Sequence, residues 1–306
     1  MRVFQHVSNH VPGPCRFVEG VEQGSEDIVL TSSGLAFISS AKKVNIVPRS
    51  LEEDFVPHGL SVHEDDLGGV RLFVVNHAKG HEERVEIFRF DAASNSLNYI
   101  RSVTHSLLYG LNDIVAIGPE RFYATNDKYS TGFYSRNAET WLLFPWSNVV
   151  YYDGGEATIV ADGFRTANGV NLSPDGNFVY VADSTTGLVT VYHRQEGDTL
   201  RRSHDISLHT TVDNVFVDAK SGDLWLGAHP KPIQLAEHFQ NASRLCGSQV
   251  LRVENPAEKD ASITAVYSDD GRSGLWGSTV GCYHNKQLLI GTVNHKLMHC
   301  TVDVPL

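Results

Sequence analysis

The sequence predicts an all-β protein, a six-bladed β-propeller that folds as a single domain over residues 1–306. Three observations lead to this prediction. A pattern of two short apolar runs joined by a turn recurs six times along the chain. The copies begin roughly 30 to 65 residues apart, a spacing typical of propeller blades. No strongly periodic helical segment interrupts the series.

Each copy is expected to form the inner hairpin of one blade. In the fourth copy, "GVNL" and "FVYVA" are strand-forming runs, and "SPDG" between them supplies proline and glycine for a turn. Runs such as "RVEIFRF", "TVYHRQ" and "SQVLRVE" are expected to add outer strands. Only about 17 residues separate the first two copies, so the first blade should have three strands, the third within "KKVNIV". The other copies begin at Ser25, Pro57, Leu111, Val212 and Gly277.

Each copy is polar where its first strand begins, and usually also where its second strand ends. In a propeller these ends meet at one mouth of the central channel. Oxygen ligands predominate there, which suits a hard cation such as Ca²⁺ better than Zn²⁺. Any single Asn or Asp is more often a turn former, but recurrence around a ring favours a cation site. The ring consists of Glu26, Asp27, His58, His77, Asn112, Asp113, Asn126, Asp127, Asn168, Asp183, Asp213, Asn214, His229, Ser278 and Thr279.

Charge and composition narrow the function classes. The formal net charge of -11 argues against nucleic-acid binding and is compatible with a bound cation. No apolar run of about 18 residues is present, and "MRVFQHVSNHVPGPC" lacks the apolar core of a signal peptide. The four cysteines are too few for a disulfide scaffold but leave room for one closing bridge.

The chain resembles the serum paraoxonase family of calcium-dependent lactonases from about Cys15 to Cys300. The matching segments, in order, are "GSEDI", "LAFISS", "PHG", "VVNH", "LNDIVA", "TND", "ANGVNLSPDG", "VDN", "GDLWLGAHP" apart from its alanine, "GSTV" and "LLIGTV". The resemblance implies two calcium ions in the channel. The catalytic ion would be bound by Glu26, Asn126, Asn168, Asp213 and Asn214, and the structural ion by Asp27, Asp127 and the backbone carbonyl of Leu60.

The resemblance also implies a reaction. Calcium would polarise the carbonyl oxygen of a lactone or aryl ester, or the phosphoryl oxygen of an organophosphate triester. His58, with His77 beside it, would activate the attacking water. A lone histidine is more often structural, whereas two on one hairpin at a metal-lined mouth favour catalysis. The substrate pocket would be lined by His229, Thr279 and Val293.

Further features follow from the resemblance. It implies a Cys15–Cys300 disulfide, and hence an oxidising, extracellular compartment. Cys246 and Cys282 would stay free, and Ala228 stands where the family usually has another cysteine. Relatives have an apolar N-terminal segment without a counterpart here, so lipoprotein or membrane association is not expected for this form. Of the glycosylation motifs at Asn171 and Asn241, only the second lies in a polar loop that is open to modification.

Three functions remain open at this point. The first is a calcium-dependent hydrolase of lactones and aryl esters with weaker phosphotriesterase activity. The second is a calcium propeller hydrolase of the sugar-lactonase or fluorophosphatase kind, and the third is a calcium-stabilised propeller that binds without catalysis. Assays of alkyl lactones with and without a chelator would distinguish them. The physiological substrate depends on pocket loops and not on the ligand ring.

Overall fold

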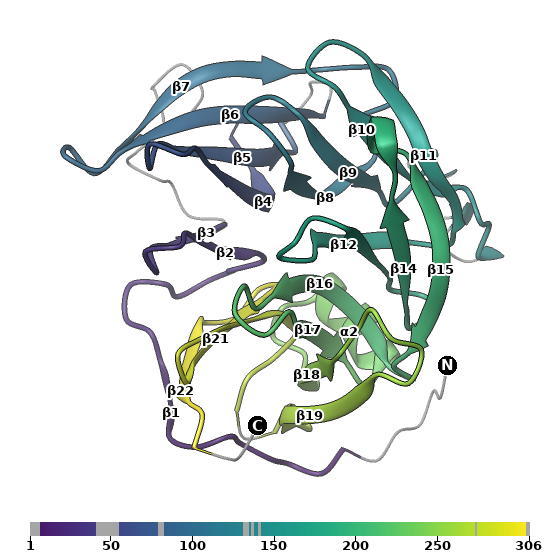
Figure 1. The fold of residues 1–306 in the computed structure, drawn as a ribbon. Helices are drawn as coiled ribbons and strands as arrows, with labels where there is room; N and C mark the ends of the chain where they lie inside the picture. Colours follow the sequence, from purple (N-terminus) through teal and green to yellow (C-terminus); the bar gives the residue numbers. More distant parts are fainter. Residues whose placement is uncertain are drawn as a thin grey trace.

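The computed structural model describes residues 7–40, 55–78, 83–130, 135, 138–139, 142–272 and 274–303. In these ranges the chain forms antiparallel sheets arranged around a central axis, as in a β-propeller (Figure 1). Five of the sheets have four strands. Their strands are β4 (Pro57–Glu64), β5 (Val70–Asn76), β6 (Arg84–Asp91) and β7 (Ser96–Val103); β8 (Leu111–Ala116), β9 (Phe122–Asn126), β10 (Ser147–Tyr152) and β11 (Ala157–Phe164); β12 (Ala167–Leu172), β13 (Phe178–Asp183), β14 (Leu188–Arg194) and β15 (Leu200–Ser207); β16 (Thr211–Val217), β17 (Leu224–His229), β18 (Ser248–Glu254) and β19 (Ser262–Asp269); and β20 (Ser278–His284), β21 (Gln287–Thr292), β22 (Met298–Thr301) and β1 (Cys15–Phe17).

The prediction of six blades is wrong, because the described residues form five. The first copy of the repeat forms only a two-stranded sheet, β2 (Ile28–Leu30) with β3 (Ala36–Ile38), which lies between the first and last four-stranded sheets (Figure 1). Each strand has three residues, and only Ile28 is fully buried, so the hairpin offers little apolar surface for outer strands. The strand expected within "KKVNIV" lies outside the described residues, so the three-stranded first blade stays a prediction.

The first strand of each repeat lies innermost. These strands contact one another in the order β2, β4, β8, β12, β16 and β20, and β20 contacts β2 again, so the ring is closed. A short 3-10 helix (Glu196–Asp198) precedes β15, and helix α2 (Pro232–Gln240) connects β17 to β18. None of the described helices is both long enough and apolar enough to cross a membrane.

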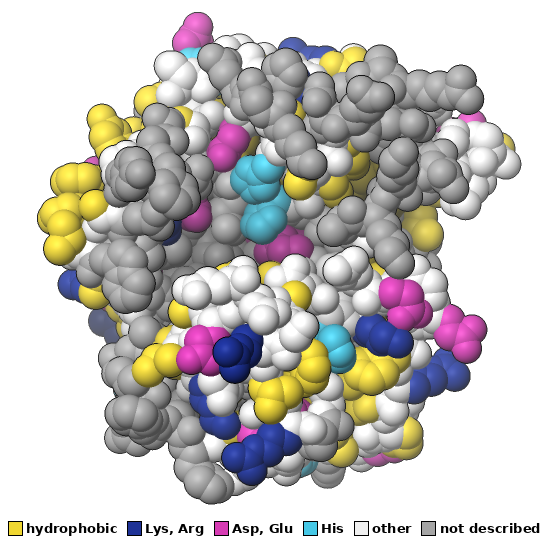
Figure 2. Space-filling model, turned by 180° about the vertical axis from the view of Figure 1, so that it is seen from behind, with side chains coloured by type: hydrophobic (Ala, Val, Ile, Leu, Met, Phe, Trp, Pro, Cys, Tyr) yellow, Lys and Arg dark blue, Asp and Glu magenta, His cyan; other side chains and the backbone are white. Residues whose placement is uncertain are grey.

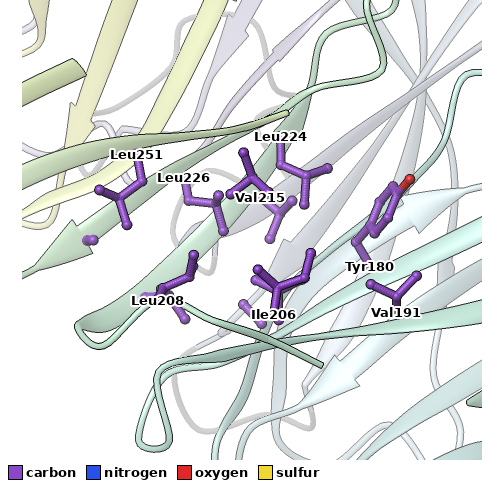
Figure 3. Close-up of a cluster of buried hydrophobic side chains, with 13 residues drawn as sticks. Tyr180, Val191, Ile206, Leu208, Val215, Leu224, Leu226 and Leu251 are labelled. Atoms are coloured by element: carbon purple, nitrogen blue, oxygen red, sulfur yellow. The ribbon is translucent and has the colours of Figure 1, made fainter. Parts of the chain in front are cut away.

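The hydrophobic core lies mainly between neighbouring blades. Figure 3 shows one such layer, in which Tyr180, Val191 and Ile206 of one sheet pack against Leu224 and Leu226 of the next. These residues alternate along their strands with residues of the opposite face, as a sheet buried on both sides requires. Burying each aliphatic side chain contributes roughly 1.5–3 kcal/mol. This packing fixes the inner strands to which the polar residues belong.

A disulfide joins Cys15 to Cys300 and fastens β1 to β22, which confirms the expected bridge. It connects residues 285 positions apart, so it closes the ring near both ends of the described chain. Cys246 and Cys282 are free and buried. Asn171 lies in β12 and donates its amide to the carbonyl oxygen of Val215 at 2.9 Å, whereas Asn241 is exposed just after α2.

Candidate functional site

One mouth of the channel opens into a pocket of about 360 Å³. Figure 2 shows histidine and acidic side chains gathered at the floor of a hollow in the middle of one face. Most of the predicted site residues line this pocket, although they come from six different hairpins. Those lining it are Glu26, His58, His77, Asn112, Asp127, Asn168, Asp213, His229, Thr279 and Val293.

The site residues occupy equivalent β-bulges in the inner strands. In β4, β8, β12 and β16, two residues at the mouth oppose a single residue of the next strand. A bulge bends the strand locally and redirects its side chains, and such bulges are common beside active sites. Here the first residue of each pair has a side chain that lines the pocket at the channel mouth. The bulged pairs are His58 with Gly59, Asn112 with Asp113, Asn168 with Gly169, and Asp213 with Asn214.

Glycine is required at two of these bulges because neighbouring inner strands approach closely. A Cβ atom on Gly59 would lie 2.6 Å from the carbonyl oxygen of Asn112, and one on Gly169 would lie 2.5 Å from the backbone nitrogen of Val215. Both distances are shorter than nonbonded contacts allow. The "HG" and "NG" pairs therefore combine a functional side chain with a residue that lets the adjacent strand approach.

Several buried oxygen atoms at the floor of the pocket have no hydrogen-bond partner in the described residues. The amide of Asn214 donates to the Glu26 carboxylate Oε1 at 2.9 Å, which leaves the amide oxygen of Asn214 and Oε2 of Glu26 bare. Leaving a buried polar atom unpaired costs roughly 1–3 kcal/mol, so several together indicate a missing partner. The unpaired oxygens are Glu26 Oε2, Asn112 Oδ1, Asn168 Oδ1 and Asn214 Oδ1.

This donor set fits a hard cation. Ca²⁺ takes six to eight oxygen ligands in flexible geometry, including carboxylates and Asn carbonyls. Among the described residues, no three His, Cys, Asp or Glu side chains form a metal-binding cluster. The set here instead combines the carboxylates of Glu26 and Asp213 with amide oxygens, which suits calcium and not zinc.

Asn126, which the resemblance implies as a ligand, has other partners in the structure. Its Oδ1 accepts hydrogen bonds from the backbone nitrogens of Tyr109 and Gly110 at 3.3 and 3.2 Å, and its Nδ2 donates to the carbonyl of Leu107 at 2.8 Å. Asn126 also pairs regularly with Leu111 at the end of β9, so it is not bulged. Asn112 has a bare amide oxygen, so it is a candidate ligand beside the predicted Asn126.

The structure also offers another carboxylate ligand for the second, structural ion. Asp127 lines the pocket mouth, with the Lys128 ammonium 3.8 Å from its carboxylate. Asp113 instead lies deeper in the channel with Asp27 and Leu60, where these residues line a cavity of about 210 Å³. Asp27 accepts from the backbone nitrogen of Leu60 and Asp113 from that of Val170, both at 2.7 Å. Each carboxylate thus links two inner strands, and Asp113 is a candidate ligand beside the predicted Asp127.

Replacing Asn112 and Asn126 separately should distinguish the two assignments. Asn112→Ala removes a bare oxygen at the pocket and should weaken calcium binding about tenfold or more, the usual scale for changes near a metal. Asn126→Ala removes buried hydrogen bonds and should lower the melting temperature at unchanged calcium affinity. Calorimetric titration and thermal unfolding of both variants would test this. The opposite pattern would restore Asn126 as the ligand.

Carboxylates are crowded in the channel. Burial, with Asp213 nearby, raises the pKa of Glu26 to about 8, and burial, with Glu26 nearby, raises the pKa of Asp27 to about 8. Burial and the charge of Asp27 also raise the pKa of Asp113 well above its usual value. Without a cation, Glu26 and Asp27 therefore bind protons around neutral pH.

Calcium binding should consequently release protons. In the metal-free protein, the stability due to protonated Glu26 and Asp27 is complete below their unfolded-state pKa of about 4 and is lost as the pH rises through about 8. Calcium replaces those protons, so its affinity should increase from about pH 6 to about pH 9. Calorimetry in buffers of different ionisation enthalpy would measure the release. Binding at neutral pH without proton release would contradict the expectation.

His58 and His77 lie side by side, as predicted for the pair. Their ring centroids are 4.8 Å apart. Nε2 of His58 lies 3.4 Å from the amide nitrogen of Asn112 and 3.6 Å from Oε1 of Glu26. Nδ1 of His77 lies 3.5 Å from the carboxylate of Glu83. Burial, followed by the neighbouring His77, lowers the pKa of His58 to about 4, so its ring is neutral and can accept a proton.

His229 has a different role from the pair. Its Nε2 lies 2.9 Å from Oδ2 of Asp213, and both side chains are buried. Burial alone would lower the pKa of His229, but the hydrogen bond to Asp213 and contact with Cys246 raise it to about 9. The imidazolium therefore holds Asp213 in place and cannot accept a proton at neutral pH.

One wall of the pocket is apolar, which sequence reasoning largely missed. Leu235 and Phe239 of α2 line it together with Leu111, Val212 and Val293. Only Val293 was predicted. Helix α2 falls between two copies of the repeat, so the repeat pattern gave no signal for it, although its Leu235 and Phe239 are four residues apart on one helical face.

Fold and site together define a β-propeller with an oxygen-lined pocket and a histidine pair at one mouth of its channel. The family model described as arylesterase matches residues 40–302. The chain is 38% identical to human serum paraoxonase/arylesterase 1 and to human serum paraoxonase/arylesterase 2, with 94% of this chain and 88% of each relative covered. The chain belongs to the arylesterase family, which confirms the resemblance inferred from its motifs.

Two solved structures have a fold similar to that of this chain. A putative gluconolactonase is similar with a TM-score of 0.55 at 13% identity, over 95% of this chain and 93% of that chain. A luciferin-regenerating enzyme is similar with a TM-score of 0.54 at 11% identity, over 96% of this chain and 100% of that chain. At such low identities the similarity concerns the propeller fold alone.

Proposed function

We propose that the protein is a calcium-dependent hydrolase of lactones and aryl esters, with weaker activity toward organophosphate triesters. The observation that carries this proposal is the group of unpaired oxygens beside the neutral His58 at the floor of the pocket. Membership of the arylesterase family supports ester hydrolysis as the class of reaction. The names of the paraoxonase/arylesterase relatives support aryl ester and organophosphate substrates.

The proposed ligands follow from the bulges and the bare oxygens. The catalytic ion would be bound by Glu26, Asn112, Asn168, Asp213 and Asn214, and the structural ion by Asp27, Asp113 and the carbonyl of Leu60. When bound, the catalytic ion would polarise the substrate's carbonyl or phosphoryl oxygen and stabilise the negative charge that develops on it.

The side chains of the pocket supply the rest of the reaction. His58 takes a proton at Nε2 from the attacking water, because its ring is neutral and this nitrogen lies beside Asn112 at the floor of the pocket. His77 packs against His58 and lies near Glu83, which orients the pair. His229 keeps the Asp213 carboxylate in one orientation. The wall formed by Leu235, Phe239 and Val293 binds the alkyl or aryl part of the substrate and excludes water.

A sugar lactonase is the second candidate, and the fold shared with a putative gluconolactonase favours it. The apolar wall argues against it, because a polyhydroxylated ring would leave its hydroxyl groups without partners there. We also infer secretion, because the Cys15–Cys300 disulfide requires an oxidising compartment to form and persist.

Turnover of three substrates by the disulfide-bonded protein tests the proposal. An alkyl-substituted δ-lactone and phenyl acetate should be hydrolysed with calcium and not with a chelator, and gluconolactone should be hydrolysed poorly. Preference for gluconolactone would select the second candidate. Calcium-dependent melting without turnover of any substrate would indicate a binding propeller, and equal rates with and without the chelator would refute the calcium requirement.

A further inference from the structure

Asp183, one of the polar residues predicted at the channel mouth, has a role that the proposed reaction does not use. It lies at the end of β13, is buried, and is not among the described residues that line the pocket. Its Oδ2 accepts a hydrogen bond from the backbone nitrogen of Arg165 at 3.1 Å. Its Oδ1 accepts from the backbone nitrogens of Thr166 at 3.2 Å and Thr186 at 3.4 Å. The carboxylate therefore ties the connection before β12 to the connection after β13.

Each of these two connections brings one hydroxyl side chain to the pocket. Thr166 comes directly before β12, Ser184 comes directly after β13, and both line the pocket. The backbone nitrogen of Ser184 donates to the carbonyl oxygen of Thr166 at 3.0 Å, so the two residues lie side by side. Backbone hydrogen bonds and the Asp183 carboxylate thus hold both hydroxyl groups at one edge of the pocket.

The two hydroxyl groups differ in their partners. The hydroxyl of Thr166 lies 2.7 Å from that of Thr185, so these two groups satisfy each other. The hydroxyl oxygen of Ser184 is buried and has no hydrogen-bond partner in the part of the chain that the structure describes. A hydroxyl group can donate one hydrogen bond and accept two, and leaving it buried and unpaired is unfavourable. Because Ser184 lines the pocket, a molecule bound there can supply the partner.

The position of Ser184 restricts which substituents suit the pocket. Leu235 and Phe239 of α2 provide an apolar wall for a hydrocarbon chain. A purely hydrocarbon chain that covered Ser184 would leave its hydroxyl unpaired, whereas a chain with one carbonyl oxygen at that point would accept its hydrogen bond. A largely apolar substituent with one additional acceptor therefore matches both features.

We propose that Ser184 is a specificity-determining residue whose hydroxyl donates a hydrogen bond to a carbonyl oxygen on the substituent of the substrate. The favoured substrates are then lactones whose alkyl chain has a ketone group in addition to the ring ester. Asp183 is the positioning residue that holds Ser184 at the edge of the pocket. The inference rests on the proposed function, because it takes lactones to be the molecules bound in this pocket.

The test compares δ-undecalactone with three derivatives that have a ketone at carbon 8, 9 or 10 of the chain. For the wild-type protein with calcium, KM for at least one derivative should be roughly fivefold lower than for δ-undecalactone, the usual effect of one hydrogen bond. The kcat values should be similar, because this bond is made equally in the ground state and the transition state. Ser184→Ala should abolish the difference in KM between the lactones, and Ser184→Thr, which retains a hydroxyl, should keep it. The control is Ser207→Ala, an exposed serine on outer strand β15 of the same sheet, which should match the wild type.

Three results would overturn the proposal. The first is equal KM for all four lactones in the wild type, and the second is an unchanged preference in Ser184→Ala. The third is loss of the preference in both Ser184→Ala and Ser184→Thr, which would mean that shape and not the hydroxyl selects the substrate. If the wild-type protein hydrolyses no lactone, the proposed function fails. Calorimetric titration with the same uncleaved lactones then tests Ser184: tighter binding of a ketone derivative that is lost in Ser184→Ala supports its role, and equal binding refutes it.

Discussion

Asp213→Ala should abolish hydrolysis of lactones and aryl esters while the propeller remains folded. Asp213 is one of the two carboxylates that face the proposed calcium ion, and its Oδ2 accepts the hydrogen bond of His229. Alanine removes that negative charge and leaves the buried imidazole of His229 without its partner. The loss should be at least about a thousandfold in kcat/KM, the upper range for removing one group that stabilises transition-state charge.

The matched control is Asp205→Ala, which changes the net charge equally. Asp205 lies on outer strand β15, where its carboxylate pairs with Arg202 at 2.6 Å. This variant should keep wild-type turnover and calcium affinity, because exposed ion pairs contribute little. Steady-state kinetics and calcium titration of Asp213→Ala and Asp205→Ala would measure these differences in turnover and calcium affinity. Near-normal turnover in a folded Asp213→Ala protein would remove Asp213 from the catalytic site.

His58→Gln should lower the rate of lactone hydrolysis by roughly 100-fold or more, the range for loss of a general base. Glutamine retains a polar side chain of similar length but cannot take a proton from water. Calcium affinity should change little, since no ligand is removed. His63→Gln is the control, because His63 lies on the same strand, β4, beyond the pocket-lining residues described.

The pH profile gives a second measure of the same role. The pKa of His58 is lowered to about 4, and the ring acts as a base only when it is unprotonated. With calcium saturating, the wild-type rate should therefore be insensitive to His58 ionisation near neutral pH and fall only in the acid range, where the ring is protonated. His58→Gln should lose this acid limb. An unchanged rate in His58→Gln would mean that another group is the base.

Much of the fold was predictable from local patterns. Six copies of one hairpin predicted a propeller because each copy cannot bury its apolar face alone and must stack on its neighbours. The polar ends of those hairpins predicted where the site would form. The number of complete blades was not predictable in this way, because the hairpin of β2 and β3 has the repeat's sequence pattern, yet no further strand pairs with it among the described residues.

The sequence by itself determined the family, the repeat and the polar mouth of the channel, since these depend on residue order and on alternation along single strands. Only the tertiary structure distinguished the two Asn-Asp pairs of one hairpin, because the bulge in β8 leaves the amide oxygen of Asn112 without a partner, while Asn126 pairs regularly with Leu111. It also placed Leu235 and Phe239 of α2 in the apolar wall of the pocket. These features join residues from separate segments, and their distances are set by how the strands pack around the axis, which no local pattern records.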